Sequence, residues 1–364
     1  MNSKNVENLC LIGKIIKIHS DFYYVQISEK NTILECKIRE KLKKAKIEIF
    51  VGDLVKIEKS SSKESNQAAI VEILPRSNYL PRPSIANVDQ VIIVAALSQS
   101  KFDFEQLNRY LCQAKLYDIS AVICINKSDL EETLKFKQKI MDIYTGIGYK
   151  VIFTSALTGL GIDELKKILE SKISVLSGMS GVGKTSLLNK IHPDLKFKTK
   201  EISVKTGKGT HSTRHVEIIG VPIGKVLQIA DTPGFSHLKF DVVMPFVINE
   251  LFDEIKEFSS GCHFSDCLHL NEEGCNVLTN LSKIDSTRYE SYKTFTQEAV
   301  EYKEKLRKEG HKEEKSSKSI DTGNKEKKQF VKLGTQARKK SRNTEKQKII
   351  SILDEVYYND NDFD

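Results

Sequence analysis

The order of two short motifs constrains the fold of this 364-residue chain more than any other feature. The segment Asn126-Lys127-Ser128-Asp129 has the form of a guanine-reading motif, and it precedes Gly178–Thr185, which has the form of a phosphate-binding loop. GTP-binding domains usually carry these motifs in the opposite order. Two further nucleotide-site segments follow, Gly209–Thr213 and Asp231–Gly234, so the parts of one GTP site are present in rotated order. A circular permutation explains this order, because it opens an exposed loop and joins termini that already lie close together.

The segment Gly178–Thr185 matches all eight positions of the phosphate-binding loop. Its three glycines let the backbone bend closely around an anion and turn N–H groups inward. The Lys184 ammonium can then neutralise the terminal phosphates, and the Thr185 hydroxyl can bind the Mg²⁺ that bridges them. The alternative is a chance glycine-rich turn, which the full match disfavours.

The segment Asn126–Asp129 predicts that the base is guanine. The Asp129 carboxylate can accept hydrogen bonds from the N1–H and the exocyclic amine of guanine, neither of which adenine offers. We expect Asn126 to brace the neighbouring loops, the Lys127 stem to lie over the base, and a backbone N–H near Ser155-Ala156 to reach O6. The alternative is an ordinary surface turn. The residues predicted to bind GTP are Asn126, Lys127, Asp129, Ser155, Ala156, Gly178, Ser180, Gly181, Val182, Gly183, Lys184, Thr185, Ser186 and Gly234.

Three residues are predicted to bind magnesium: Thr185, Thr213 and Asp231. Asp231 ends a predicted strand and would hold the ion through water, while the Gly234 N–H senses the γ-phosphate. Thr213 is the preferred source of the second hydroxyl ligand, and Thr210 is the alternative.

The residue after the Asp-x-x-Gly motif is Phe235, where many GTPases have a glutamine that orients the attacking water. A phenylalanine ring cannot do this, so another group in the chain or on a partner must. His211 is the catalytic candidate within the chain, and an exposed loop histidine without a role is the alternative.

A cysteine and histidine cluster predicts a structural zinc site. Cys262, Cys267, His269 and Cys275 supply three thiolates and one imidazole, the ligand set of a closed tetrahedral Zn²⁺ site without catalytic vacancy. His263 is an alternative ligand, and three cysteines packed as small apolar residues are the alternative to a metal. The other four cysteines lie in apolar contexts and are predicted to be core residues.

Hydrophobic patterning predicts several domains. Residues 1–76 contain five short strands with partly alternating patterns, which suit an OB-fold β-barrel. Its basic residues form a candidate phosphate-facing surface or simply a solvated rim: Lys14, Lys17, Arg39, Lys41, Lys43, Lys44 and Lys46. Residues 77–247 alternate strands with helices and predict a circularly permuted P-loop α/β domain with a hairpin near residues 215–230. Residues 248–302 form a helical zinc-binding domain, and 303–364 a basic tail that we expect to be mostly disordered.

Composition excludes some classes of protein. The chain has no run of about 18 apolar residues and no apolar core of a secretion signal near Met1, so we expect a cytoplasmic protein without membrane contact. Seven cysteines, three of them clustered, argue against a disulfide framework. A net charge of +8 is a weak indication of a polyanionic partner.

Taken together, these residues resemble the RsgA (YjeQ/YloQ) family of circularly permuted bacterial ribosome-biogenesis GTPases. The resemblance covers about residues 8–300 and includes the barrel, Arg82-Pro83, Ala86–Gln90, the rotated motifs and the zinc pattern. It implies a monomeric factor that binds the 30S subunit and its 16S rRNA late in maturation. It also implies slow GTP hydrolysis that the subunit stimulates, with Phe235 and His211 matching the family's hydrophobic replacement and switch histidine. The basic tail extends beyond this resemblance.

Two other functions compete with this one. A GTP-binding RNA chaperone would show little turnover, so measured hydrolysis would separate it from a GTPase. A metabolic phosphotransferase would need an acceptor pocket and a catalytic base, and the sequence shows neither.

Overall fold

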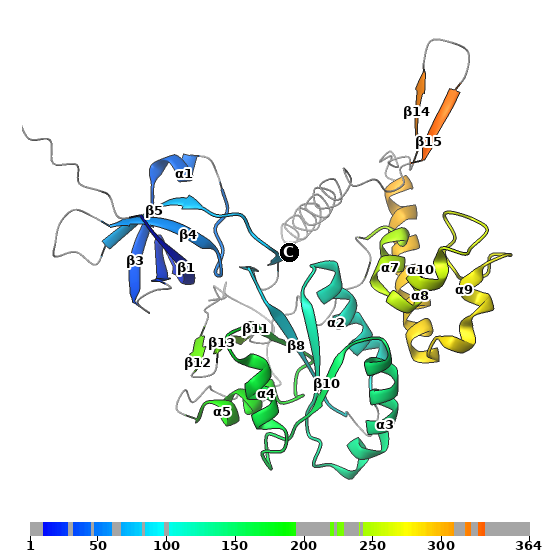
Figure 1. The fold of residues 1–364 in the computed structure, drawn as a ribbon, viewed down its shortest axis with the longest axis horizontal. Coiled ribbons are helices and arrows are strands. Elements are labelled where there is room, and N and C mark those ends of the chain that lie inside the picture. Colours follow the sequence, from blue (N-terminus) through cyan, green and yellow to red (C-terminus); the bar gives the residue numbers. More distant parts are fainter. Residues whose placement is uncertain are drawn as a thin grey trace, which may run out of the picture. The chain divides into compact units, whose positions relative to one another are not determined.

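The computed structural model describes residues 10–27, 32–44, 47–59, 67–81, 84–97, 102–193, 219–221, 224–228, 240, 243–308, 317–321 and 327–331. The chain forms two compact units, Met1–Leu238 and Lys239–Asp364 (Figure 1). In the described part of the chain, no helix combines the length and the apolar character needed to cross a membrane.

The N-terminal part is a closed five-stranded barrel, as predicted. Its strands run in the order β1-β2-β3-β5-β4, with β3 and β5 parallel and the other pairs antiparallel. Alternating apolar residues point inward, because successive side chains of a strand face opposite sides, and Ile15, Val25 and Ile57 are fully buried there. A short helix between β3 and β4 was not predicted. The elements are β1 Cys10–His19, β2 Phe22–Ile27, β3 Ile33–Ile38, α1 Glu40–Lys44, β4 Leu54–Lys59 and β5 Gln67–Ile73.

A small hairpin joins the barrel to the next domain. Strands β6 (Tyr79–Pro81) and β7 (Ser84–Ala86) pair antiparallel, and the Ala86 N–H donates to the Val51 carbonyl of the barrel at 2.8 Å. The approach is close because Gly52 has no side chain: a Cβ there would lie 2.0 Å from the Ala86 carbonyl oxygen. Gly52 also has a φ of +94°, so it is the residue type that both the space and the backbone require.

The charged pair Arg76 and Asp53 fastens the same junction. Asp53 is fully buried, and its two carboxylate oxygens accept from the Arg76 guanidinium at 2.7 and 3.0 Å. The Phe50 N–H donates to Asp53 as well, and the guanidinium lies 4.5 Å from the centre of the Phe50 ring. A buried carboxylate needs such partners, because without them its desolvation would favour the protonated form.

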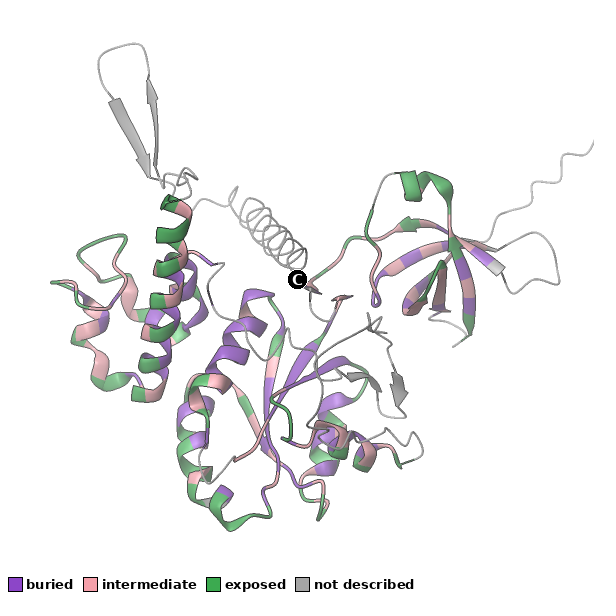
Figure 2. Ribbon diagram, turned by 180° about the vertical axis from the view of Figure 1, so that it is seen from behind, coloured by how far each residue is buried: buried purple, intermediate pink, exposed green. Residues whose placement is uncertain are grey.

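The nucleotide domain is a six-stranded sheet in the order β10-β9-β8-β11-β13-β12. The first five strands are parallel and β12 is antiparallel to β13, so the predicted α/β fold is confirmed. Strands β8 and β11 are almost wholly buried, as the purple strands of Figure 2 show. The elements are β8 Gln90–Ala95, α2 Phe104–Leu116, β9 Ser120–Ile125, α3 Glu131–Gly146, β10 Lys150–Phe153, α4 Ile162–Leu169, β11 Ile173–Ser177, α5 Lys184–Ile191, β12 Ile219–Val221 and β13 Gly224–Gln228.

Helices cover both faces of this sheet (Figure 1). Leu165 and Leu169 of α4 and Leu187 of α5 pack on one face with Val94 and Cys124. Helix α2 contacts β8 and β9, and α3 contacts β10. The predicted hairpin is present, but its first strand begins at Ile219, and residues 215–218 lie outside the described part.

The C-terminal unit is built around the long helix α10. Phe240, Phe252 and Phe295 are fully buried, and the Phe240 and Phe295 ring centres are 4.8 Å apart. Because Phe240 packs here, this unit begins before the domain boundary at residue 247 expected from the sequence. The elements are α7 Pro245–Leu251, α8 Asp253–Ser259, α9 Asn276–Thr279, the 3₁₀ turn η2 Leu281–Lys283 and α10 Ser286–Lys308. The tail contains a strand pair, β14 Ser317–Asp321 and β15 Lys327–Val331, where the sequence indicated mostly disorder.

Replacing Gly52 with alanine should destabilise the protein more than replacing Gly148. Both glycines have a positive φ, but a Cβ at the exposed Gly148 meets nothing within 4 Å. Alanine at either site costs about 1–2 kcal/mol of backbone strain, and at Gly52 the overpacking adds roughly 1–3 kcal/mol. Denaturant unfolding followed by circular dichroism measures both losses. Equal losses would mean that the approach of Ala86 to Gly52 contributes nothing to stability.

Candidate functional site

The carboxyl ends of β9, β10 and β11 bring the predicted nucleotide residues to one edge of the sheet, with β8 between β9 and β11. The register pairs Ala95 with Ile125, and Ile125 with Phe153, the last residues of β8, β9 and β10. Ser177, the last residue of β11, pairs with Ile93 of β8. The segments that follow these strands therefore begin side by side, although they are more than 20 residues apart in sequence. Open α/β sheets bind ligands at this edge.

The phosphate loop has the backbone that its glycines predicted. Gly178, Gly181 and Gly183 have φ values of +141°, +79° and +96°. A Cβ at Gly178 would lie 2.0 Å from the Val94 carbonyl oxygen, so the loop can pass the end of β8 only with glycine there. The Lys184 Nζ donates to the carbonyls of Gly178 and Met179 at 2.7 and 2.8 Å, which holds its charge across the mouth of the loop.

Asn126 connects three loops of the site. Its Nδ2 donates to the Val182 carbonyl of the phosphate loop at 2.8 Å. Its Oδ1 accepts from the Thr154 hydroxyl and from the Ala156 N–H, both at 3.3 Å. Asn126 is buried, and a Cβ at Gly183 would lie 2.3 Å from its Nδ2, so the two residues fit closely. The bracing contact expected from the sequence is therefore present.

The Asp129 carboxylate is exposed, and a hydrogen bond from the Ser155 side chain fixes its position. The Ser155 hydroxyl is fully buried and donates to Asp129 Oδ1 at 2.5 Å. The same hydroxyl oxygen accepts from the Thr158 N–H at 3.1 Å, so its direction is fixed. This arrangement leaves Asp129 Oδ2 available for a ligand. The sequence placed Ser155 in the site for its backbone N–H and missed the role of its side chain.

Lys127 has a left-handed backbone, with φ +60°. Its carbonyl accepts from the Thr133 hydroxyl at 3.1 Å and from the Leu130 N–H at 3.2 Å. Thr133 is fully buried at the start of α3. No motif points to Thr133, so sequence reasoning had no signal for this contact.

The remaining predicted residues fall outside the described part of the chain: His211, Thr213, Asp231 and Gly234. Of the three predicted magnesium ligands, the structure describes only Thr185, in the first turn of α5. Strand β13 runs parallel to β11, with Gln228 beside Leu176, and so directs the chain toward the same sheet edge before Asp231.

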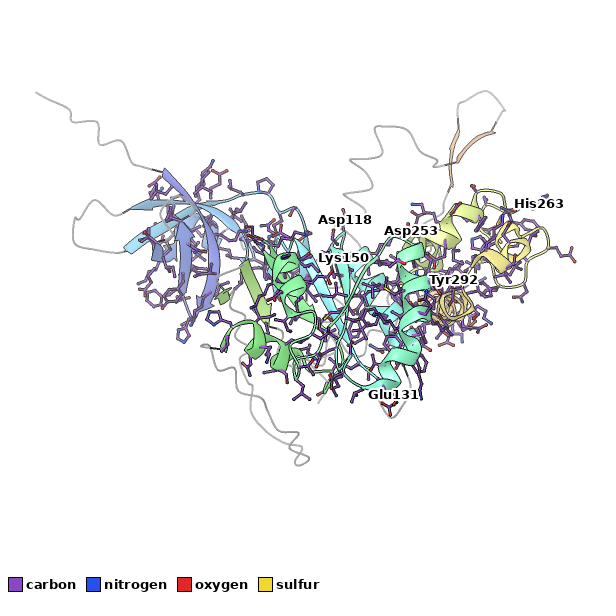
Figure 3. All side chains as sticks on the ribbon, turned by 60° about the horizontal axis from the view of Figure 1, so that its bottom comes forward. Asp118, Glu131, Lys150, Asp253, His263 and Tyr292 are labelled. Carbon is purple, nitrogen blue, oxygen red and sulfur yellow. The ribbon has the colours of Figure 1, made fainter. Side chains whose placement is uncertain are left out.

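The four predicted zinc ligands lie together in the C-terminal unit. Their ligand atoms are all within 4.8 Å of one another. Cys262 Sγ lies 3.8 Å from Cys275 Sγ and 3.5 Å from His269 Nδ1, and Cys275 Sγ lies 3.4 Å from that nitrogen. Ordinary Zn–S and Zn–N bond lengths in a tetrahedron give edges of about 3.8 Å and about 3.6 Å. The cluster therefore fits a tetrahedral metal site, and it does not include the exposed His263, labelled in Figure 3.

Burial sets the protonation of these ligands. Burial raises the pKa of the Cys267 thiol to about 12 and also raises the pKa of Cys275, while it lowers the pKa of His269. The lowered pKa favours the neutral imidazole, the form that binds a metal, and a bound cation would supply the charge that favours the thiolates. For Glu272, burial raises the pKa, but N–H groups of Leu268, Leu270 and Asn271 outweigh this and hold it below its usual range.

Family models match the chain over most of its length. The model described as RsgA N-terminal domain matches residues 12–68, and the model described as RsgA GTPase matches residues 73–241. A third, described as 50S ribosome-binding GTPase, matches residues 174–312. It begins at the strand before the phosphate loop and leaves Asn126–Asp129 outside, which is consistent with the rotated motif order.

Relatives and solved structures match almost over their full lengths. Proteins named Small ribosomal subunit biogenesis GTPase RsgA are 41% identical in Caldanaerobacter subterraneus and 42% identical in Bacillus velezensis. The first alignment covers 81% of this chain and 97% of the relative; the second covers 80% and 98%. The crystal structure of YjeQ from Thermotoga maritima has a TM-score of 0.68 at 30% identity, covering 80% of this chain and 99% of the other.

The crystal structure of YloQ, described as a circularly permuted GTPase, also has a TM-score of 0.68, at 34% identity, and covers 82% of this chain and 98% of that one. The rotated motifs, the closed barrel and the cysteine–histidine cluster agree with these matches. The chain belongs to the RsgA family of circularly permuted GTPases.

Proposed function

We propose that this GTPase assists the maturation of the small ribosomal subunit in the cytoplasm, binding the 30S particle and its 16S rRNA and hydrolysing GTP faster when bound. The observation that carries the proposal is the convergence of the rotated motifs at one sheet edge, in a chain about two-fifths identical to proteins named for small-subunit biogenesis. The positive charge supports an RNA partner. Residues 327–348 contain nine Lys and Arg and one Glu, so their excess of positive charge is as large as the net charge of +8 of the whole chain.

In this proposal, the described residues bind the nucleotide from both ends. The loop amides and Lys184 hold the phosphates, and Thr185 contributes a hydroxyl to Mg²⁺. Asp129 reads the guanine edge, with Ser155 fixing its second oxygen. Asn126 sets the distance between the phosphate-binding part and the base-binding part of the site, because it bonds to Val182 in the first and to Ala156 in the second.

The Asp129→Asn variant should bind GTP about 10- to 100-fold more weakly, because two hydrogen bonds to a charged acceptor are lost. Its relative affinity for xanthosine triphosphate should rise, since the carbonyl that replaces the guanine amine needs a donor. Nucleotide binding by fluorescence titration measures both. Asp142→Asn is the matched control, since Asp142 lies on α3 and bonds to Gln138. Undiminished GTP binding in Asp129→Asn would refute the assignment.

We further propose that catalysis needs a group that the free protein does not hold in place. Phe235 occupies the usual position of the water-orienting residue, and His211 is the candidate within the chain. Fixing a water molecule and ordering a catalytic segment can each change a rate by orders of magnitude. Docking on ribosomal RNA would bring His211 toward the γ-phosphate or supply the missing group.

Hydrolysis by the free protein should therefore be slow, and purified 30S subunits should stimulate it at least about 10-fold. His211→Ala should lose the stimulated rate and still bind GTP. Phosphate release with and without subunits measures this. Equal turnover in both conditions would reject activation by the subunit, and negligible turnover in both would favour the GTP-binding RNA chaperone. A fully active His211→Ala would reject only the role of the histidine.

We propose that the cluster of Cys262, Cys267, His269 and Cys275 holds one structural Zn²⁺, because the distances among its ligand atoms fit a tetrahedral zinc site. All four positions are protein ligands, so the ion stabilises the C-terminal unit and takes no part in hydrolysis.

Purified protein should contain one zinc per chain, and the double variant Cys267→Ala, Cys275→Ala should contain none, because two of four ligands are gone. Elemental analysis measures the content. Cys112→Ala is the control, since Cys112 is a buried core thiol in α2. Full zinc content in the double variant would exclude this ligand set.

A further inference from the structure

The ring of His269 lacks the contact that usually orients a metal-bound histidine. Its Nδ1 faces the sulfurs of Cys262 and Cys275, at 3.5 and 3.4 Å. The other ring nitrogen, Nε2, is buried and has no hydrogen-bond partner among the residues that the structure describes. A metal-bound imidazole normally donates this second N–H to a carboxylate or carbonyl, which fixes the ring. The orientation of His269 must therefore come from elsewhere.

The main chain of His269 is held in an uncommon conformation by two tyrosines. His269 has φ +58°, a value that non-glycine residues rarely adopt. The Tyr289 hydroxyl donates to the His269 carbonyl at 2.8 Å, and the Tyr292 hydroxyl donates to the carbonyl of Leu268 at 2.9 Å. Both tyrosines are buried on α10, three residues apart and so on one face of the helix (Tyr292 is labelled in Figure 3).

One carboxylate binds the N–H groups of the same loop. Glu272 Oε1 accepts from the Leu268 N–H at 2.8 Å, and Oε2 accepts from Leu270 and Asn271 at 2.9 and 3.1 Å. The carbonyls of the two peptide groups that flank His269 are therefore held by the tyrosines, and the Leu270 N–H that follows His269 is held by the carboxylate. Rotation of the His269 backbone would break hydrogen bonds to the tyrosines and to Glu272.

We propose that Glu272, Tyr289 and Tyr292 are the positioning residues of the metal site, and that they orient His269 through its main chain instead of through its ring. This inference rests on the proposed zinc site and names what sets its geometry. The three residues hold the loop in its metal-binding shape. The loop therefore loses less conformational entropy when the ion binds and regains less when the ion leaves. The two tyrosines also join the loop that contains His269 to α10, the helix that carries the core residue Phe295.

The first test compares Glu272→Gln with Glu273→Gln in the full-length, zinc-loaded protein. Glu273 is the next residue and is exposed, so the control removes the same charge without removing the bonds to Leu268, Leu270 and Asn271. Zinc release to an excess of a colorimetric chelator should be about 10-fold faster in Glu272→Gln and unchanged in Glu273→Gln. Equal rates in Glu272→Gln and the parent, or equal acceleration in both variants, would overturn the proposal.

A second test removes one hydroxyl and keeps the aromatic packing. Tyr289→Phe, loaded with Co²⁺ in place of zinc, should show shifted visible absorption bands and faster metal loss, because the His269 geometry is altered. A residue that only stabilised the fold would leave the spectrum of the bound ion unchanged, and that result would contradict the positioning role. This variant also decides the question if Glu272→Gln does not fold. Parent protein without any zinc would instead reject the proposed metal site itself.

Discussion

The side chain of Asn126 holds together the loops that carry the predicted nucleotide residues. A primary amide carries two acceptor lone pairs and two donors, so it can join several loops at once. Here its donor reaches Val182 in the phosphate loop, and its acceptor receives Thr154 and Ala156 in the loop after β10. The residue is buried, so any of these groups left unpaired would carry a desolvation cost. The amide thereby fixes the spacing between the phosphate end and the base end of the site.

The permutation leaves this interaction unchanged, because it alters the connections between strands and not their neighbours. Strands β9, β10 and β11 still end at one edge, and the loops after them still meet. What changes is the chain order: the guanine motif comes before the phosphate loop, and the Asp231 motif comes shortly before α7, at the start of the C-terminal unit. A segment expected to respond to the γ-phosphate is thus followed in sequence by α7 and α8 and then by the cysteine–histidine cluster, so the chain connects the Asp231 motif to that cluster.

The C-terminal unit combines an aromatic core with a cysteine–histidine cluster. Phe240, Phe252 and Phe295 pack around α10, and Arg288 pairs with Glu254 at 2.6 Å while its guanidinium lies over the Phe252 ring. The loop of residues 262–275 contains few apolar side chains, and Glu272 and the tyrosines of α10 hold its main chain by hydrogen bonds.

The sequence alone determined the residue types of the site. The motifs predicted the phosphate loop, the guanine-reading segment and four candidate metal ligands, because each chemistry needs particular side chains at short, fixed spacings. Hydrophobic periodicity identified most strands and helices, and Phe104–Leu116 and Ile162–Leu169 agree with it residue by residue. Short helix α1 and the packing of Phe240 were not predicted, since both depend on contacts with residues far away in the chain.

Only the tertiary structure decided how these residues are held. The hydroxyl of Ser155 behind Asp129, Thr133 behind Lys127 and the tyrosines behind His269 belong to no motif. Each acts across 6 to 26 residues of sequence, between elements that meet only when the chain folds. A side chain that positions another has no fixed spacing from it, because many elements could bring a donor to the same place. That geometry is decided by packing, and a local pattern of residues does not contain it.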